Sequence, residues 1–428
     1  MRVICRASEL GVVQARDAWK KFSPYMKNMA RHLEVMKQED KSNKEGPRIE
    51  RPFARDARSV VVEWGIVLLR VGDPQLIAPV LGTATFLPAA IKNIASDPPE
   101  LVDKLLQVML DKVLTSRELS FPMRAALFSA FNLEMLATVL RSSDPSVLAR
   151  GASGVDKAAP DPKLAGALRD KVCRVLQTFT CEVLSSSTER AGAANVKLLL
   201  PLVTTLRPSD DVLQQQLLIS ILKKHPPLQG HYLVASPLPL MPAASHKFLT
   251  SAAVMAKTLA LIPGSDADSS LLHQLHILPP HQEHTYLQQI SAGLLAGGIT
   301  AIPAPPTHTT ILADWVAPPL LCKGSLSPGL QHASYLVRLA TAQMLLLILA
   351  RLDSAVGALC GVSAVLSSAT AHGAGNEAAA AAGITSTMWR DAAARLKRIV
   401  RARLPDFQVL VAVRQHAATR AAPSGSGG

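Results

Sequence analysis

The sequence predicts an all-α protein, and three observations lead to this fold class. Hydrophobic residues make up 48% of the chain but aromatic residues only 4%, so the apolar surface comes mainly from Leu, Ala, Val and Ile, which favours helix over sheet. Apolar residues also recur at helical spacing in one segment after another. Finally, prolines punctuate nearly every gap between these segments, as expected where helices end.

The expected helices follow in chain order. In the first, apolar residues recur at Val60, Val61, Trp64, Val67 and Leu68, and Asp73-Pro74 ends the run. The second covers about 99–114, with Ser96-Asp97 as its cap before two prolines that suit a first turn. A third spans about 122–140. Helical patterns resume at 166–186, 194–206, 210–224, 245–261, 283–296 and 330–359.

A helix, a proline-containing turn and a second helix form a unit of roughly 40 residues, the length typical of HEAT and armadillo repeats. We therefore expect a helical-repeat α-solenoid with proline-rich loops. The expected regions are a charged N-terminal segment, a first helical-repeat half, a flexible connection, a second helical-repeat half, an Ala/Gly low-complexity insert, a basic C-terminal helix with a closing motif, and a disordered tail. They cover residues 1–50, 51–149, 150–163, 164–360, 361–388, 389–414 and 415–428, respectively.

Several of these regions are expected to lack a stable fold of their own. Residues 1–50 mix both signs of charge and suggest a tether or a frayed helix with a solvated surface. Residues 150–163 have no apolar period. Residues 361–388 have few large side chains to bury, so we expect them not to fix a fold.

The longest apolar run, Leu339 to Leu349, predicts a buried helix and no membrane span. It is shorter than the roughly 20 residues that a bilayer requires, and Arg338 and Arg351 close it. The first residues carry charges through what would be the apolar core of a signal peptide, so secretion is not expected. The five cysteines form no C-x-x-C pair, which indicates neither a zinc ribbon nor a disulfide framework.

No catalytic motif is present. The chain has no phosphate-binding loop and no G-x-S-x-G elbow, so we expect neither an enzyme nor a cofactor. Only one cluster invites a metal site: His273, His276, His281 and His284, with Glu283 between the last two histidines. Because Pro279-Pro280 breaks the helix that a metalloprotease motif needs, polar loop histidines are the favoured interpretation.

Basic residues give a better functional signal. The net charge is +13, which would attract a polyanion. One predicted helix, with Leu396, Ile399 and Val400 as its apolar positions, carries a basic group consisting of Arg395, Lys397, Arg398, Arg401 and Arg403. This face could dock on phosphates. It could equally be a solubilising face over a core contact, because no aromatic residue interleaves to stack bases.

Three blocks of sequence resemble one known family. The first begins at Arg51-Pro52, continues through Arg55 and Arg58, and reaches Asp97-Pro98-Pro99 before alternating leucines. The second contains Leu206-Arg207-Pro208, Asp211, Leu213-Gln214-Gln215, Ile221-Leu222-Lys223, Pro226 and Tyr232-Leu233. The third contains Pro318-Pro319-Leu320, Lys323, Gly329-Leu330-Gln331-His332, Ser334 and Leu336-Val337-Arg338, and Leu404-Pro405-Asp406 follows as a short closing motif.

Together these blocks, over roughly residues 51–410, resemble the N-terminal domain of the nucleolar pre-ribosomal-associated protein one family. No resemblance is found in residues 1–50, 150–163 or 361–388. Members of that family are much longer than 428 residues, so the chain looks like the first domain only.

The resemblance implies a non-catalytic nucleolar scaffold for early precursors of the large (60S) ribosomal subunit. The implied partners are pre-rRNA, assembly factors that include a DEAD-box helicase, and small nucleolar ribonucleoproteins. A protein-only α-solenoid adaptor remains the alternative, because the same helices would serve it. The candidate RNA- or partner-binding residues are Arg51, Arg55, Arg58, Arg207, Lys223, Lys224, Lys323, Arg338, Arg395, Lys397, Arg398, Arg401 and Arg403.

Overall fold

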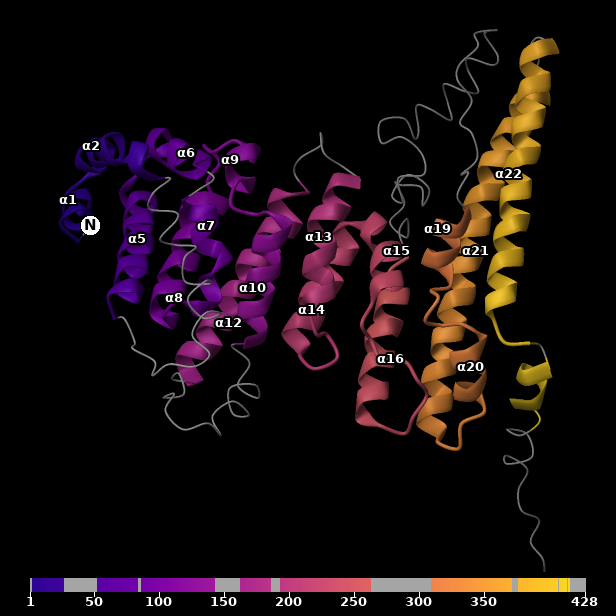
Figure 1. Ribbon diagram of the computed structural model, residues 1–428. Coiled ribbons are helices and arrows are strands. Elements are labelled where there is room, and N and C mark those ends of the chain that lie inside the picture. Colours follow the sequence, from indigo (N-terminus) through magenta and orange to yellow (C-terminus); the bar gives the residue numbers. More distant parts are fainter. Residues whose placement is uncertain are drawn as a thin grey trace, which may run out of the picture. The chain divides into compact units, whose positions relative to one another are not determined.

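A computed structural model describes residues 2–26, 52–83, 86–142, 162–185, 193–262, 309–371, 376–406, 408–413 and 415. Over these ranges the chain is helical and contains no strand, which confirms the all-α prediction (Figure 1). The chain divides into two compact units, one of residues 1–190 and 197–207 and the other of residues 191–196 and 208–428. The helix that begins at Pro162 packs on helices of the first unit. Most of the connection expected at 150–163 and the helix expected at 283–296 lie outside the described residues.

The N-terminal unit is built from α-helices of 5 to 20 residues. Its α-helices are α1 (Arg2–Glu9), α2 (Val12–Phe22), α5 (Pro52–Val71), α6 (Pro74–Gly82), α7 (Leu87–Lys92), α8 (Pro99–Val108), α9 (Phe121–Ala125), α10 (Ala130–Ser142) and α12 (Pro162–Gln177). Short 3₁₀ turns lie at Ser23–Tyr25 and Ile94–Ser96, and α8 and α12 continue as π-helical turns at Met109–Leu114 and Thr178–Val183. Helix α13 (Ala193–Thr205) crosses the division between the units.

The first helices are folded onto this unit, so the expectation of a tether or frayed helix is wrong for residues 2–26. Trp19 and Trp64 have ring centroids 6.0 Å apart, and Phe86 lies 5.9 and 5.7 Å from them. The indole nitrogen of the fully buried Trp64 donates to the hydroxyl of Ser8 at 3.2 Å. Aromatic pairs of this kind stabilise by about 0.5–1.5 kcal/mol beyond their burial. Contacts with large aromatic side chains of distant segments therefore fold residues 2–26 onto the unit, although their sequence is charged and weakly periodic.

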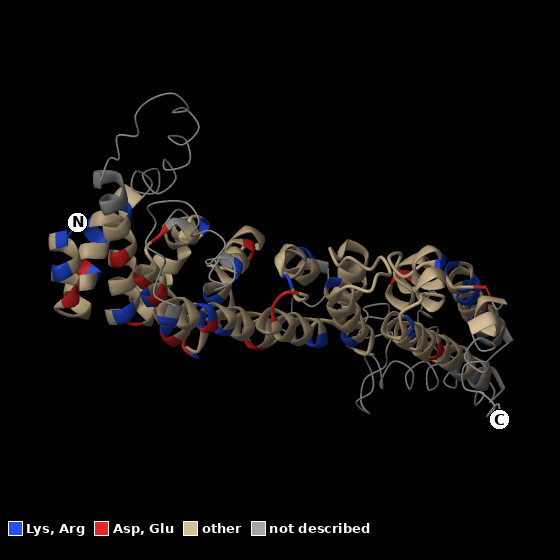
Figure 2. Ribbon diagram, turned by 90° about the horizontal axis from the view of Figure 1, so that it is seen from below, with Lys and Arg blue, Asp and Glu red and all other residues tan. Residues whose placement is uncertain are grey.

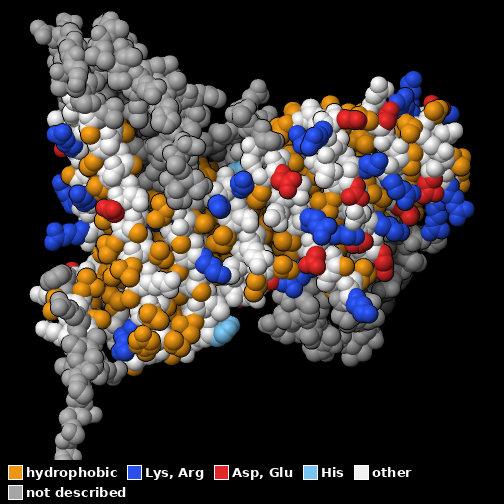
Figure 3. Space-filling model, turned by 180° about the vertical axis from the view of Figure 1, so that it is seen from behind, with side chains coloured by type: hydrophobic (Ala, Val, Ile, Leu, Met, Phe, Trp, Pro, Cys, Tyr) orange, Lys and Arg blue, Asp and Glu red, His pale blue; other side chains and the backbone are white. Residues whose placement is uncertain are grey.

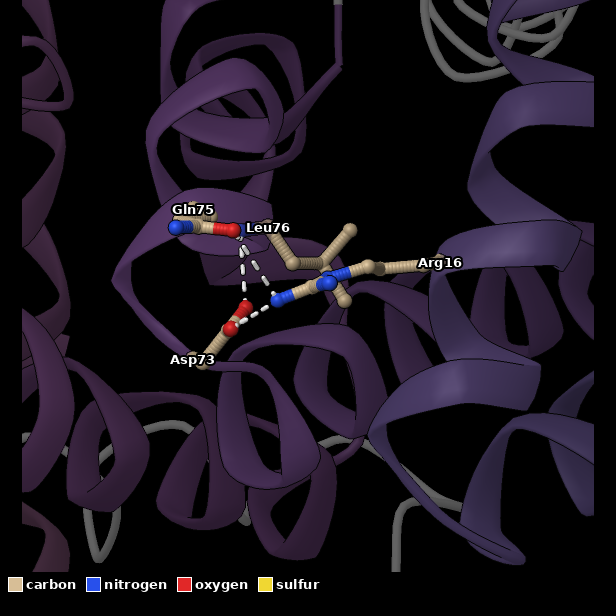
Figure 4. A network of polar contacts seen from close by, with 4 residues as sticks. All are labelled: Arg16, Asp73, Gln75 and Leu76. Carbon is tan, nitrogen blue, oxygen red and sulfur yellow. Dashed lines mark hydrogen bonds and ion pairs between the residues drawn. The ribbon is translucent and has the colours of Figure 1, made fainter.

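Helix α2 is also tied to the start of α6 by an ion pair (Figure 4). Asp73 is the N-cap of α6 and accepts from the backbone amide of Leu76 at 3.0 Å. Arg16 donates to the same carboxylate and, at 3.2 Å, to the side-chain oxygen of Gln75. Partial desolvation acts to raise the pKa of Asp73, but the Arg16 guanidinium and the Leu76 amide outweigh it and hold the pKa below 3.8.

A pH dependence follows from this lowered pKa. Asp73 stabilises the fold above the carboxyl's unfolded pKa, and this contribution disappears as the pH falls through the lower folded pKa. We expect Asp73→Asn to melt below the wild type at pH 6, because asparagine keeps the cap but not the ion pair. The difference in melting temperature, measured by circular dichroism, should vanish at acidic pH. A difference that is the same at pH 3 and pH 6 would contradict this assignment.

Arg58 forms a buried bidentate ion pair with Asp97. Its Nε and Nη2 donate to the two carboxylate oxygens at 2.6 and 2.7 Å, and Nη2 also donates to the carbonyl of Ala90 at 2.8 Å. The two side chains are only 3% and 4% exposed. Asp97 therefore does not cap α8 as expected: the N-cap is Pro98, which makes no side-chain cap.

The predicted helix at 122–140 is two helices, α9 and α10, separated by a turn. The amide group of Asn132 holds this turn, because its Nδ2 donates to the carbonyl of Leu127 at 2.8 Å and to that of Pro88 at 3.3 Å. Asn132 is 1% exposed. A buried side chain that bonds to backbone carbonyls in this way competes with a continuous helix.

The C-terminal unit has longer helices toward its end. They are α14 (Val212–Lys224), α15 (Pro226–Ala235), α16 (His246–Leu259), α19 (Thr309–Val316), α20 (Lys323–Leu330), α21 (Tyr335–Ala371) and α22 (Asn376–Arg403). Helices α21 and α22 form an antiparallel pair, and α21 also packs on α16, α19 and α20 (Figure 1).

One buried cation joins four helices of this unit. Arg351, on α21, is 0% exposed, and its guanidinium lies 4.4 Å from the ring centre of Trp315 on α19. It donates to the backbone oxygens of Trp315, Leu259, Thr258 and Leu261 and to Oε1 of Gln229 on α15, at 2.6, 2.7, 2.7, 3.1 and 3.1 Å. The carbonyls come from the C-terminal ends of α16 and α19, where helix dipoles favour a positive charge.

Helix α21 differs from the prediction for the apolar run in two ways. The helix continues past Arg351, because backbone oxygens such as that of Trp315 accept hydrogen bonds from the buried guanidinium. The stretch Tyr335–Ala364 is therefore long and apolar enough to cross a membrane. Only 33% of its most apolar window is buried, whereas we expected a buried helix. The core helix of a soluble protein meets the same criteria of length and composition, and the absence of a membrane partner stays a prediction.

The Ala/Gly segment at 361–388 is helical outside 372–375, contrary to expectation. It forms the end of α21 and the start of α22. The hydroxyls of Ser363 and Ser386 lie 2.9 Å apart, and each donates to the other residue's carbonyl at 3.0 Å. Alanine has the highest intrinsic helix propensity, so the segment does not need large side chains to be helical.

Candidate nucleic-acid interface

Helix α22 presents two different faces. Trp389, Ala392, Ala393, Leu396 and Val400 are buried at the spacing of one helix face. The opposite face is exposed and carries Arg390, Arg395, Lys397, Arg398 and Arg401. We call these residues the α22 basic row.

The α22 basic row has little local compensation. Asp391 is the acidic residue beside it on the exposed face. Figure 3 shows Lys and Arg side chains gathered along the edge of the unit that α22 forms. Arg390 and Arg401 are 11 positions apart, and a helix rises about 16 Å over that separation, so the row offers positive charge along an extended line rather than at one point. Figure 2 colours the Lys and Arg residues of the ribbon blue.

Arg390 is a member of this row that the sequence analysis missed. It is exposed, and its Nη2 donates to the hydroxyl of Ser367 at 3.4 Å. Its place seven and eleven residues before Lys397 and Arg401 puts it on their helix face, a periodicity that could have identified it.

Arg403, by contrast, is used inside the protein. Its Nη1 lies 2.7 Å from a carboxylate oxygen of Asp314 and 2.7 Å from the carbonyl of Ala317, so it fastens the end of α22 to α19. Its side chain is 24% exposed. Lys323 is exposed but forms an ion pair with Asp406.

The other candidate residues are dispersed. Lys223 and Lys224 are exposed in the last turn of α14, where the helix dipole favours cations, and Arg207 is exposed before that helix. Arg338 is half-buried and donates to the carbonyl of His332 at 3.4 Å. Arg51 lies outside the described residues, and Arg55 is on α5 but its side chain is not described.

Arg58 does not lie on the candidate surface. Its guanidinium is buried against Asp97, as described above, and cannot be offered to an external phosphate without breaking that pair. Removing one partner of a buried ion pair costs about 3–5 kcal/mol, so an RNA would have to repay that amount.

The chemistry of the α22 basic row is limited to charge. Lysine and arginine bind phosphate oxygens, and arginine can do so with two parallel hydrogen bonds. Trp389, the aromatic residue within α22, is buried and cannot stack on a base. The row can therefore hold a nucleic-acid backbone without reading its sequence.

A metal site is not found in the described part of the chain. No group of three or more His, Cys, Asp or Glu side chains is placed there to hold an ion. The histidine cluster at His273, His276, His281 and His284 lies outside the described residues.

Comparison with known proteins identifies a family that matches the chain. The model of the family Npa1, described as ribosome 60S biogenesis N-terminal, matches residues 7–251. The match includes the first two blocks of resemblance and most of residues 1–50, where no resemblance was expected; the third block and the closing motif lie beyond it. No curated protein and no solved structure matches the chain.

Proposed function

Because the chain belongs to the Npa1 family, and so has a role in 60S ribosome biogenesis, we propose that it is a non-catalytic scaffold that organises pre-rRNA and assembly factors in early pre-60S particles. The α22 basic row carries this proposal, because it supplies a net positive charge along an exposed helix face. The site of action is the nucleolus. The protein partners are a DEAD-box helicase, other assembly factors and small nucleolar ribonucleoproteins.

The helical architecture supports a scaffold. Helix pairs that stack as HEAT-like repeats expose long faces on which several partners can bind at once. We propose this solenoid arrangement for the chain, with RNA contacts concentrated on α22 and weaker contributions from Arg207, Lys223 and Lys224.

A protein-only adaptor is the second candidate. It is favoured by the use of Arg58 and Arg403 for internal ion pairs. The burial of Trp389, the aromatic residue within α22, also favours it. In that case the row would only keep the unit soluble.

Crosslinking in cells separates the two candidates. The tagged full chain is irradiated, and the attached RNA is sequenced beside that of a variant with Arg395, Lys397, Arg398 and Arg401 replaced by glutamine. We expect precursor rRNA of the large subunit to dominate the wild-type library and to decrease in the variant. Assembly factors that co-purify without any RNA above background would instead establish the adaptor.

A further inference from the structure

Helix α21 exposes an apolar stripe that no other described element covers. Tyr335, Leu339, Leu346 and Leu349 are 65%, 51%, 66% and 42% exposed, and Ala342 lies between them in the same line. We call these five residues the α21 stripe. Figure 3 shows apolar side chains gathered on this end of the C-terminal unit. Large exposed apolar patches on a soluble protein generally mark interaction sites.

The spacing of the α21 stripe is that of a helix-to-helix seam. Consecutive residues of the stripe are separated alternately by four and by three positions. Four positions after Leu349 lies the exposed Asp353. Arg338 lies beside Tyr335 at the start of the line. The stripe thus has a phenol and a guanidinium at one end and a carboxylate at the other.

We propose that the α21 stripe is the seam of a homodimer, in which α21 of a second copy binds antiparallel to it. In this register Tyr335 and Arg338 meet Asp353 of the second copy, Leu339 meets Leu349, and Ala342 meets Leu346. Two-fold symmetry repeats every contact, so the phenol and guanidinium of each copy bind the carboxylate of the other.

Charge complementarity selects this occupant and this direction. A parallel copy would place the Asp353 carboxylates opposite one another and Arg338 opposite Arg338, which is unfavourable. A lipid surface would have to accept the carboxylate of Asp353 and the amide of Gln343, which are exposed on the same side of the helix. An RNA backbone is a row of charged phosphates and does not bury apolar leucine side chains.

Sedimentation velocity of the full chain tests the dimer. The wild type should shift from monomer to dimer across the micromolar range. Leu346→Glu should weaken this association roughly 100-fold, because it buries charge at the centre of the seam. The side chain is largely exposed in the monomer, so circular dichroism and the melting temperature should not change. Met241→Glu, at an apolar side chain that is also largely exposed but lies off the stripe, should leave dimerisation unchanged.

A charge exchange tests the antiparallel register. Asp353→Arg alone should weaken the dimer, and Arg338→Asp combined with Asp353→Arg should restore it, since symmetry pairs the exchanged charges again. Failure of the double variant to restore the dimer would overturn the register. A wild-type chain that stays monomeric throughout the range, or that instead floats with anionic phosphatidylserine vesicles, would overturn the proposal.

Discussion

Replacing Arg351 by alanine is expected to destabilise the C-terminal unit by about 3–5 kcal/mol, the cost of removing one partner from a buried charged network. The substitution leaves the carbonyls of Leu259 and Trp315 buried without the donor that Arg351 supplies. The carbonyl of Thr258 loses the same donor but still accepts from the backbone amide of Leu261 at 3.2 Å. Each unsatisfied buried acceptor costs about 1–3 kcal/mol, although local relaxation would recover a part. It also opens a cavity beside Trp315.

Lysine should rescue Arg351 only in part. Burial lowers the pKa of Arg351 to about 9, so the cation remains protonated at neutral pH and its charge is not in question. What lysine lacks is the planar fork that reaches acceptors on α15, α16 and α19 at once. Arg351→Lys should therefore lie between the wild type and Arg351→Ala in stability.

Urea unfolding followed by tryptophan fluorescence measures this effect, and hydrogen exchange localises it to the ends of α16 and α19. Arg398→Ala is the matched control, because it removes an exposed guanidinium from the neighbouring helix and should change stability by less than about 0.5 kcal/mol. If Arg351→Ala unfolds at the same urea concentration as this control, the hydrogen bonds that Arg351 donates do not hold the unit together.

Arg351 also illustrates what the sequence could and could not predict. Local periodicity located α5, α8, α12, α14 and α16 near their observed bounds, because each has its own apolar face. Arg351 was interpreted as the end of an apolar run, since its acceptors lie about 90 residues away in the chain at Thr258, Leu259 and Leu261. Long-range partners of this kind leave no local pattern.

The candidate surface shows the same limit. A list of basic residues cannot distinguish Arg58 and Arg403, which form internal ion pairs, from Arg395 and Arg398, which face solvent. The acidic partners Asp97 and Asp314 are 39 and 89 residues from them by position in the sequence. Only the amphipathic period of α22 gave local information, and it predicts the exposed positions of Arg395, Lys397, Arg398 and Arg401.

The second large effect is expected at the α22 basic row. Replacing Arg395, Lys397, Arg398 and Arg401 by glutamine should weaken binding of a structured fragment of large-subunit pre-rRNA by roughly 10²–10³-fold at 0.15 M salt. If each cation contacts one phosphate, the plot of log K against log salt concentration should become shallower by about 3 units, because fewer counterions are released. Base sequence should hardly matter, since the row has no stacking side chain.

The control for this loss must separate position from total charge. Replacing Arg2, Arg6, Lys20 and Lys21 of α1 and α2 by glutamine removes four exposed cations too, so both variants fall from +13 to +9 (13 − 4 = 9). Electrophoretic shift or fluorescence anisotropy over a salt series should show the larger loss for the α22 variant. Equal losses would mean that RNA responds to net charge alone and that α22 is not the interface. An unchanged salt slope in the α22 variant would likewise rule out phosphate contacts by this row and favour the protein-only adaptor.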